Sequence, residues 1–429
     1  MELDSRERLQ VRIVWLPPQT GPLGSTLATM RGSVVLDRVR TAARSGQLTI
    51  QHHDAIIGAA TQDEFDDSDI ADLAQILAGS GQGLHRPGAS FDLASTGGPG
   101  SLSTLIGPLC LRAVGCEVRS LGVPGRPAGG VDVLAQLSDY RLDLSPAEAD
   151  GVLSRAGYVH LLANSTWTPM DGSLFERRQA CGAQACPPLV ISSLLSKKLA
   201  LGVTVVGLDV RVGPHGNFGA DVAEVTANTD RFVHVANLLG IDARVYISES
   251  ALPEQPYIGR GEALLALHEI LYGRPGAWLG SHLERIWSIT QQLAGAPDEW
   301  QPPIQLLRQA WEANLMAQSS GPTSFERSLA EIRSQPTATV SAPGSGRLQV
   351  DLGALRATIV AEQRRSASEG APFADPIGVT LLCRPGSPVE RGVHVAVVRL
   401  SADVSAIPTT ALNAFTVIVP EAKSCRAAG

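Results

Sequence analysis

The sequence predicts an α/β protein with a small helical domain, a larger mixed α/β domain and a β-rich C-terminal domain. Apolar residues recur at helical spacing early in the chain, short apolar strands alternate with helices in the middle, and strand-like runs dominate the end. The 429 residues leave room for two or three domains. We expect an N-terminal extension over 1–30, a helical domain over 31–83 that is completed by about 170–201, an α/β domain over 84–169 and 202–316, and a β-rich domain over 340–429.

The helical domain is predicted from two periodic segments. Apolar residues between 34 and 42 fall on one helical face, and residues 67–77 repeat the pattern. The glycines within 79–83 are typical of a helix end followed by a linker. Ahead of this domain, residues 9–16 are predicted to form a strand.

The α/β domain is predicted from short apolar runs that alternate with amphipathic segments. The run 203–212 is apolar almost throughout, as a parallel strand buried on both faces requires. Loops at the carboxyl ends of such strands are the expected place of a functional site. The predicted strands are 91–95, 116–121, 158–162, 203–212 and 242–247, the predicted helices are 101–114, 187–201 and 226–239, and the loops of interest are 96–100, 122–130 and 163–168.

The C-terminal domain is predicted to follow a linker. Residues 317–340 are polar and contain glycine, proline and serine, which favours a linker there. Residues 375–382 and 393–400 are expected to be strands, with a turn at 385–388 between them.

Composition excludes several classes of protein. Hydrophobic residues make up 44% and charged residues 18%, as in ordinary globular proteins, and the net charge of −7 with scattered basic residues argues against a nucleic-acid binder. Residues 1–10 have no apolar core and the longest apolar run, 199–208, is too short to span a bilayer. The six cysteines have neither the density of a disulfide scaffold nor zinc-site spacing, so we expect free thiols, no metal and a cytoplasmic location.

A glycine-rich turn is the first candidate site. Ser95, Thr96, Gly97 and Gly98 lie between a predicted strand and a predicted helix. Glycines let backbone N–H groups approach an anion, and the positive end of a following helix adds to the attraction. The turn therefore predicts an anion site, with a merely structural tight turn as the alternative.

The helix predicted over 187–201 carries the second candidate site. Ser193 and Lys197 are four residues apart and share one helical face. Lys198 points elsewhere and is expected to be a solvated surface charge. An exposed lysine is also the alternative for Lys197, although its neighbours in the helix are apolar.

These segments together resemble the thymidine and pyrimidine nucleoside phosphorylase family. The resemblance covers about residues 35–400 and is most specific in the predicted helix and the strand after it. The resemblance implies that this chain has the α/β fold described above and that it assembles as a homodimer. The similar stretches are 189–202 and 205–213 for the core signature, 95–98 for the phosphate-binding turn, 257–261 for a later Gly-Arg segment, and 375–381 with Gly386 and Gly392 for the C-terminal β domain.

The resemblance implies a site for a pyrimidine nucleoside, with inorganic phosphate as co-substrate and no other cofactor. The family's pyrimidine-binding arginine, serine and lysine correspond to Arg178, Ser193 and Lys197. Arg178 and Lys197 would also be catalytic, because negative charge develops on the departing base and two cations stabilise it. The phosphate would be bound by Ser95, Thr96, Gly97, Gly98, Thr104 and Ser120.

The predicted site has a pyrimidine-binding half and a phosphate-binding half, and the residues around the phosphate-binding half differ from the family's pattern. Leu93 and Ala94 occupy the positions of a Lys-His pair, and Gly130 occupies that of a threonine. Phe175 and Gln179 replace a tyrosine and an aspartate, and Ser101 replaces the aspartate that closes the glycine turn.

A compensating cation for this half is predicted in the loop 122–130. Our hypothesis is that Arg126, or less favourably Arg119, supplies the missing charge, with an ordinary surface arginine as the alternative. Two other interpretations stay open for the whole protein: pentosyl transfer with a different acceptor or substrate, and pyrimidine binding without catalysis.

Overall fold

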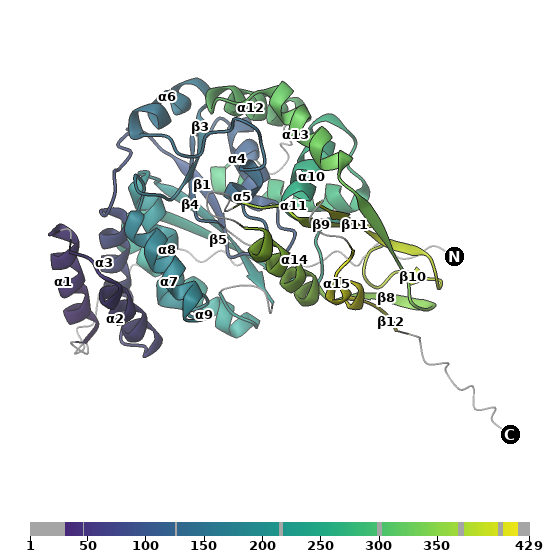
Figure 1. Cartoon of the computed structure of the whole chain (residues 1–429). Helices are drawn as coiled ribbons and strands as arrows, with labels where there is room; N and C mark the ends of the chain where they lie inside the picture. Colours follow the sequence, from purple (N-terminus) through teal and green to yellow (C-terminus); the bar gives the residue numbers. More distant parts are fainter. Residues whose placement is uncertain are drawn as a thin grey trace.

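The computed structural model describes residues 31–45, 47–124, 127–213, 218–297, 303–367, 373–401 and 406–418 (Figure 1). The predicted strand at 9–16 lies outside the described residues. The predicted fold class is confirmed: a helical layer, a parallel sheet between helices, and a β-rich C-terminal part are all present. The domain boundaries themselves stay a prediction.

The central sheet has five parallel strands in the order β3-β2-β1-β4-β5. All five predicted strands are confirmed, and two of them begin and end at the predicted residues. β1 is the central strand, so its carboxyl end lies beside the carboxyl ends of β2 and β4. The strands are β1 (Phe91–Ser95), β2 (Val118–Gly122), β3 (Tyr158–Leu162), β4 (Val205–Val212) and β5 (Asp242–Glu249).

Helices cover both faces of this sheet. Leu93 packs into a core with helices on one face, whereas the next residue, Ala94, packs into the core on the other face. This alternation follows from the two-residue side-chain period of a strand. The first face carries α4 (Ser103–Ala113), α10 (Arg260–Tyr272), α11 (Ala277–Ala294) and α12 (Ile304–Ala317), and the second carries α8 (Pro187–Ala200) and α9 (Val222–Leu238). Two further helices, α5 (Gly130–Leu134) and α6 (Pro146–Ala156), follow β2.

The helical layer combines segments that are far apart in the sequence. α1 (Arg31–Arg44) and α3 (Asp67–Ala78) contact each other, and α3 packs against α8. α7 (Pro169–Ala180) contacts α2 (Ile50–Thr61), α3 and α8 (Figure 1). Helix α2 was not predicted, because its two histidines and central glycine weaken its apolar pattern.

The predicted linker over 317–340 is wrong. Its residues form α13 (Pro322–Ser334) and most of β7 (Thr337–Ser341). Pro322 lies in the first turn, where proline is favoured, and Phe325, Leu329 and Ile332 bury one helical face in the core. Glycine, proline and serine thus mark the start of a helix here rather than a flexible connection.

The C-terminal part contains two small antiparallel sheets and two helices that were not predicted. The predicted strands at 375–382 and 393–400 are confirmed as adjacent strands. The additional helices are α14 (Leu352–Ser366) and α15 (Thr409–Asn413), which contact each other. The first sheet has the order β6-β9-β11-β7, with β6 (Tyr257–Ile258), β9 (Ile377–Leu381) and β11 (His394–Leu400); the second has the order β10-β8-β12, with β8 (Gly346–Val350), β10 (Pro388–Val389) and β12 (Phe415–Ile418).

Candidate functional site

A cavity of about 470 Å³ lies at the carboxyl end of β1 and brings the two predicted half-sites together. Its wall comes from the glycine-rich turn, the loop after β2, the helices α7 and α8, and one face of α14. Of the predicted site residues, it is lined by Ser95, Thr96, Gly97, Gly98, Thr104, Ser120, Arg178, Ser193 and Lys197. Arg126 lies outside the described residues, so its proposed role stays a hypothesis.

Lys197 is buried at the base of this cavity and is tied to Ser193. Its Nζ donates to the hydroxyl of Ser193 at 2.8 Å and lies 2.6 Å from Oδ2 of Asp171 in α7. Burial lowers the pKa of Lys197, and the charge of Asp171 opposes that change. Asp171 therefore acts as a counter-ion that favours the charged lysine. It was missed because its partner is 26 positions away, and no local motif links the two.

Arg178 is fixed by backbone carbonyl groups. Its guanidinium donates to the carbonyl oxygen of Gln184 at 2.8 Å and to that of Leu189 at 3.0 Å, and its Cζ lies 5.9 Å from the centre of the Phe175 ring. Burial lowers the pKa of this arginine. The side chain is thereby oriented before any ligand binds, as a preorganised cation should be.

The prediction that Lys198 is a solvated surface charge is wrong. Its side chain is 4% exposed and forms an ion pair with Asp92 in β1, whose side chain is equally buried. Ser120 in β2 donates its hydroxyl proton to the other oxygen of Asp92 at 2.6 Å. Helix α8 is therefore joined to the centre of the sheet by a buried charge pair, which helical periodicity alone did not reveal.

The glycine-rich turn has the backbone geometry that its sequence predicts. Gly97 and Gly98 have φ values of 98° and 111°, in the left-handed region that favours glycine. The hydroxyl of Thr96 accepts the backbone N–H of Arg211 at 3.0 Å, and that of Ser95 accepts the N–H of Gly97 at 3.3 Å. The side chain of Thr96 thus fastens the turn to β4.

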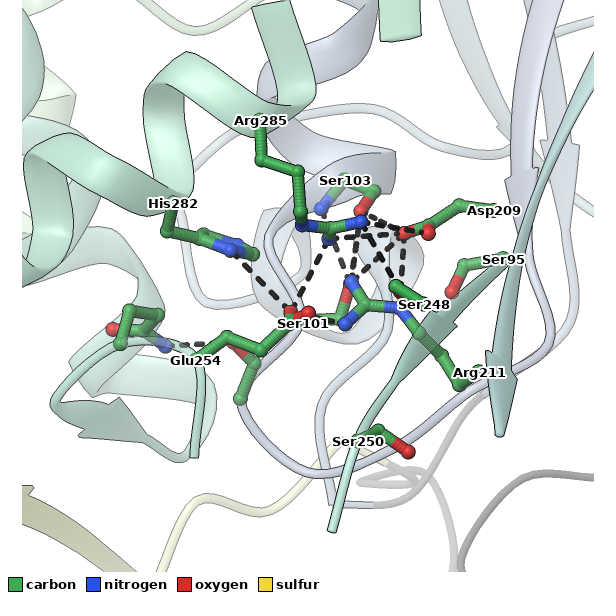
Figure 2. A network of polar contacts seen from close by, with 12 residues as sticks. Ser95, Ser101, Ser103, Asp209, Arg211, Ser248, Ser250, Glu254, His282 and Arg285 are labelled. Atoms are coloured by element: carbon green, nitrogen blue, oxygen red, sulfur yellow. Dashed lines mark hydrogen bonds and ion pairs between the residues drawn. The ribbon is translucent and has the colours of Figure 1, made fainter. Parts of the chain in front are cut away.

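A buried charge network supports this turn from behind (Figure 2). Arg211 donates to Asp209 at 2.8 Å and to Ser101 at 2.9 Å, and it also forms an ion pair with Glu254. Arg285 in α11 contacts the same two carboxylates, at 3.0 and 3.2 Å. Two carboxylates face two guanidinium groups, so the charges balance, and the cations hold the pKa of Asp209 well below its ordinary value.

His282 completes the support and is held neutral. Its Nε2 accepts the backbone N–H of Leu102 at 3.2 Å, and its Nδ1 lies 3.4 Å from Glu254. Burial lowers the pKa of His282 to about 3. Asp209 and Arg211 fall in the core-signature stretch 205–213, but Glu254, His282 and Arg285 lie outside the similar stretches and could not be found by sequence because their contacts are long-range.

Two departures from the family's pattern have a packing reason. The Leu93 side chain is 2% exposed in the core, and a Cβ added at Gly107 or Gly207 would lie within 3 Å of it. At Gly130, a Cβ would lie 2.7 Å from the ring of His160, which fills the space that a threonine would need. Burial lowers the pKa of His160 to about 4.

Arg119 does not face the cavity. It is fully buried and donates to the carbonyl oxygen of Leu201 at 2.9 Å, with Glu117 as its ion-pair partner. It is therefore committed to the junction between β2 and the end of α8, which removes it as a replacement for the missing cation. Arg356 and Arg364 from α14 do line the cavity, and neither was predicted from sequence.

The described residues contain neither a group of three or more His, Cys, Asp or Glu side chains that could hold a metal ion nor a helix long and apolar enough to cross a membrane. Cys110, Cys116, Cys181, Cys186 and Cys383 are free thiols, as expected.

Comparisons with known proteins point to one family. A pyrimidine-nucleoside phosphorylase from Staphylococcus haemolyticus is 26% identical over 254 residues, which are 58% of this chain and 58% of that protein. The human thymidine phosphorylase is 27% identical over 75% of this chain and 71% of its own length, and that of Mycobacterium tuberculosis is 27% identical over 83% and 84%.

No protein-family profile matches the chain. Among solved structures, anthranilate phosphoribosyltransferase from Thermus thermophilus aligns with a TM-score of 0.49 and 15% identity, over 71% of this chain and 96% of that one. The sequence relatives carry the names of the family that the motifs of this chain resemble. The chain is similar in sequence to thymidine and pyrimidine nucleoside phosphorylases, at 26% to 27% identity.

Proposed function

We propose that this protein is a pentosyltransferase that cleaves a pyrimidine nucleoside with inorganic phosphate, giving the free base and a pentose 1-phosphate. The supporting observation is that Arg178, Ser193 and Lys197 line the same cavity as the glycine-rich turn. Curated relatives named for this reaction share about a quarter of the aligned residues.

In the proposed reaction, an oxygen of phosphate attacks C1′ while the C1′–N1 bond breaks. The electron pair of that bond leaves with the pyrimidine, and the proton of hydrogen phosphate ends on the base. Arg178 and Lys197 bind the charge that spreads over the base as it departs, and they bind it more tightly than the neutral base. Asp171 keeps Lys197 charged, and Ser193 fixes the direction of its ammonium group.

The glycine-rich turn would hold the phosphate through backbone N–H groups. The hydroxyl of Ser120 is donated to Asp92 and that of Thr96 binds β4, so these two side chains serve the architecture of the turn. Thr104, which lines the cavity, is the hydroxyl that we expect to contact phosphate. Because few side chains of this turn are available to donate hydrogen bonds to phosphate, we expect cationic side chains from other segments to bind it as well.

The test is release of base from uridine, thymidine and cytidine, measured by chromatography with and without phosphate. We expect phosphate-dependent release, and a loss of about 10²–10³ in kcat for Arg178→Gln, as for removal of one donor that stabilises transition-state charge. The matched control is Arg177→Gln, because Arg177 is the next residue on α7 but pairs with Asp54, away from this cavity. It should keep the activity.

Other outcomes would replace the proposal. Release of base only when another acceptor is supplied would support a different pentosyl transfer, which the changes at Leu93 and Ala94 make worth testing. Calorimetric binding of nucleoside without any turnover would instead indicate a pyrimidine-binding protein.

A further inference from the structure

Helix α14 contributes one face to the cavity. Arg356, Val360 and Arg364 all line it, and their spacing of four residues places them on the same side of the helix. They come from the C-terminal part of the chain, more than 150 positions after the last residue of α8. The cavity is thus closed on one side by a segment outside the resemblance's specific motifs.

The position of α14 is fixed against the loop after β2. The buried side chain of Gln363 donates from Nε2 to the carbonyl oxygen of Pro127 at 2.6 Å. On its other face, Leu352, Leu355 and Ile359 pack into the core of the C-terminal part. The arginines are therefore presented by a packed helix rather than by a loose surface segment.

The charges that face this cavity are unbalanced. Among the described residues that line it, Asp92 is the single carboxylate, and it already pairs with Lys198. Arg178, Lys197, Arg356 and Arg364 add four further cationic side chains. Lys197 also has a counter-ion, Asp171, which lies outside the lining of the cavity.

The two cavity-lining arginines of α14 also repel each other electrostatically. Burial lowers the pKa of Arg356, and the positive charge of Arg364 lowers it further. Arginine side chains nevertheless stay charged at neutral pH. The nearest acidic residue along the helix, Glu362, pairs with Arg365 at 2.8 Å. Two like charges held at one cavity wall are stabilised when an anion binds between them.

We propose that Arg356 and Arg364 bind a phosphoryl dianion in this cavity and supply the cationic charge that the phosphorylase pattern has at the position of Leu93. Planar guanidinium groups suit the oxygens of a phosphate, each donating two parallel hydrogen bonds. The dianion is either inorganic phosphate, the co-substrate of the proposed function on which this inference rests, or a phosphate ester carried by the nucleoside itself.

Calorimetric titration of the full-length protein in a phosphate-free buffer tests the site. The probes are inorganic phosphate, uridine and uridine 5′-monophosphate, each at two ionic strengths. The variants are Arg356→Gln, Arg364→Gln and the double variant, and the matched control is Arg365→Gln, which lies next to Arg364 but outside the cavity. A lysine at both positions serves as the conservative variant.

We expect each glutamine variant to weaken phosphoryl binding roughly ten- to a hundredfold, the effect of losing a charge-assisted hydrogen bond. Arg365→Gln should stay within about twofold, and the double lysine variant should recover part of the affinity. If phosphate binds and the monophosphate gains nothing over uridine, the dianion is the acceptor. If the monophosphate binds at least about tenfold tighter than uridine and the gain depends on the two arginines, the substrate is a nucleotide.

The anion site is refuted if the double variant binds both phosphoryl probes as the unmodified protein does, or if the unmodified protein binds neither. Its failure is separable from that of the proposed function. Phosphate binding that depends on Arg356 and Arg364, without cleavage of any nucleoside, would leave the anion site standing and remove the phosphorylase reaction. Phosphorolysis whose rate and phosphate dependence do not change in the arginine variants would support the phosphorylase reaction and remove the anion site.

Discussion

The buried pair between Lys198 and Asp92 makes a sharp prediction about stability. Each side chain is 4% exposed, so water does little to screen either charge. Lys198→Met keeps most of the apolar stem but removes the cation, leaving the Asp92 carboxylate with the hydroxyl of Ser120. Removing one partner of a buried ion pair costs about 3–5 kcal/mol, because the other charge stays buried without compensation.

Urea unfolding followed by circular dichroism measures this cost. Lys198→Met should lower the free energy of unfolding by about 3–5 kcal/mol. The double variant Lys198→Met/Asp92→Asn should recover most of it, because a neutral amide can still accept the hydrogen bond of Ser120. As a control, Arg365→Met removes an exposed arginine that pairs with Glu362 on the same helix and should change the free energy by less than about 1 kcal/mol. A Lys198→Met protein as stable as the parent, or a double variant as unstable as the two single variants summed, would refute the reasoning.

The residues around the glycine-rich turn make two further predictions. Restoring the family's lysine by Leu93→Lys should destabilise the protein by roughly 3 kcal/mol or more in thermal unfolding and should not improve phosphate binding, because this side chain packs against Gly107 and Gly207 in the core; a stable variant with tighter phosphate binding would contradict this. His282, whose pKa falls from 6.5 to about 3 on folding, takes up its proton more readily in the unfolded chain, so its contribution to stability is present above pH 6.5 and is lost as the pH falls towards 3. Between pH 7 and pH 5 this loss is about 2 kcal/mol, and unfolding of His282→Gln, which can still accept the N–H of Leu102, should show a correspondingly weaker pH dependence; an unchanged dependence would exclude the assignment.

Strands and local turns were predictable because their causes are local. β1 and β3 begin and end where the apolar runs do, and Gly97 and Gly98 adopt the positive φ values for which glycine is suited. The same local reasoning failed at α13, where the composition indicated a linker. Phe325, Leu329 and Ile332 recur at helical spacing and are all buried, so the segment forms an amphipathic helix.

The site was only partly predictable for the same reason. Helical spacing placed Ser193 and Lys197 together correctly, yet it made Lys198 a surface residue. Periodicity tells which residues share a face, but not whether the opposite face is covered. Here α8 lies between the helical layer and the sheet, so both faces are buried, and Lys198 needs the partner that β1 provides.

Neighbours along the chain were enough to predict the strands of the central sheet and the glycine-rich turn. Which charges meet was settled by the packing of distant elements. Asp171 reaches Lys197, Arg285 reaches Asp209, and the arginines of α14 reach a cavity formed by the first half of the chain. The free energy of such contacts depends on burial, which spacing along the sequence does not encode.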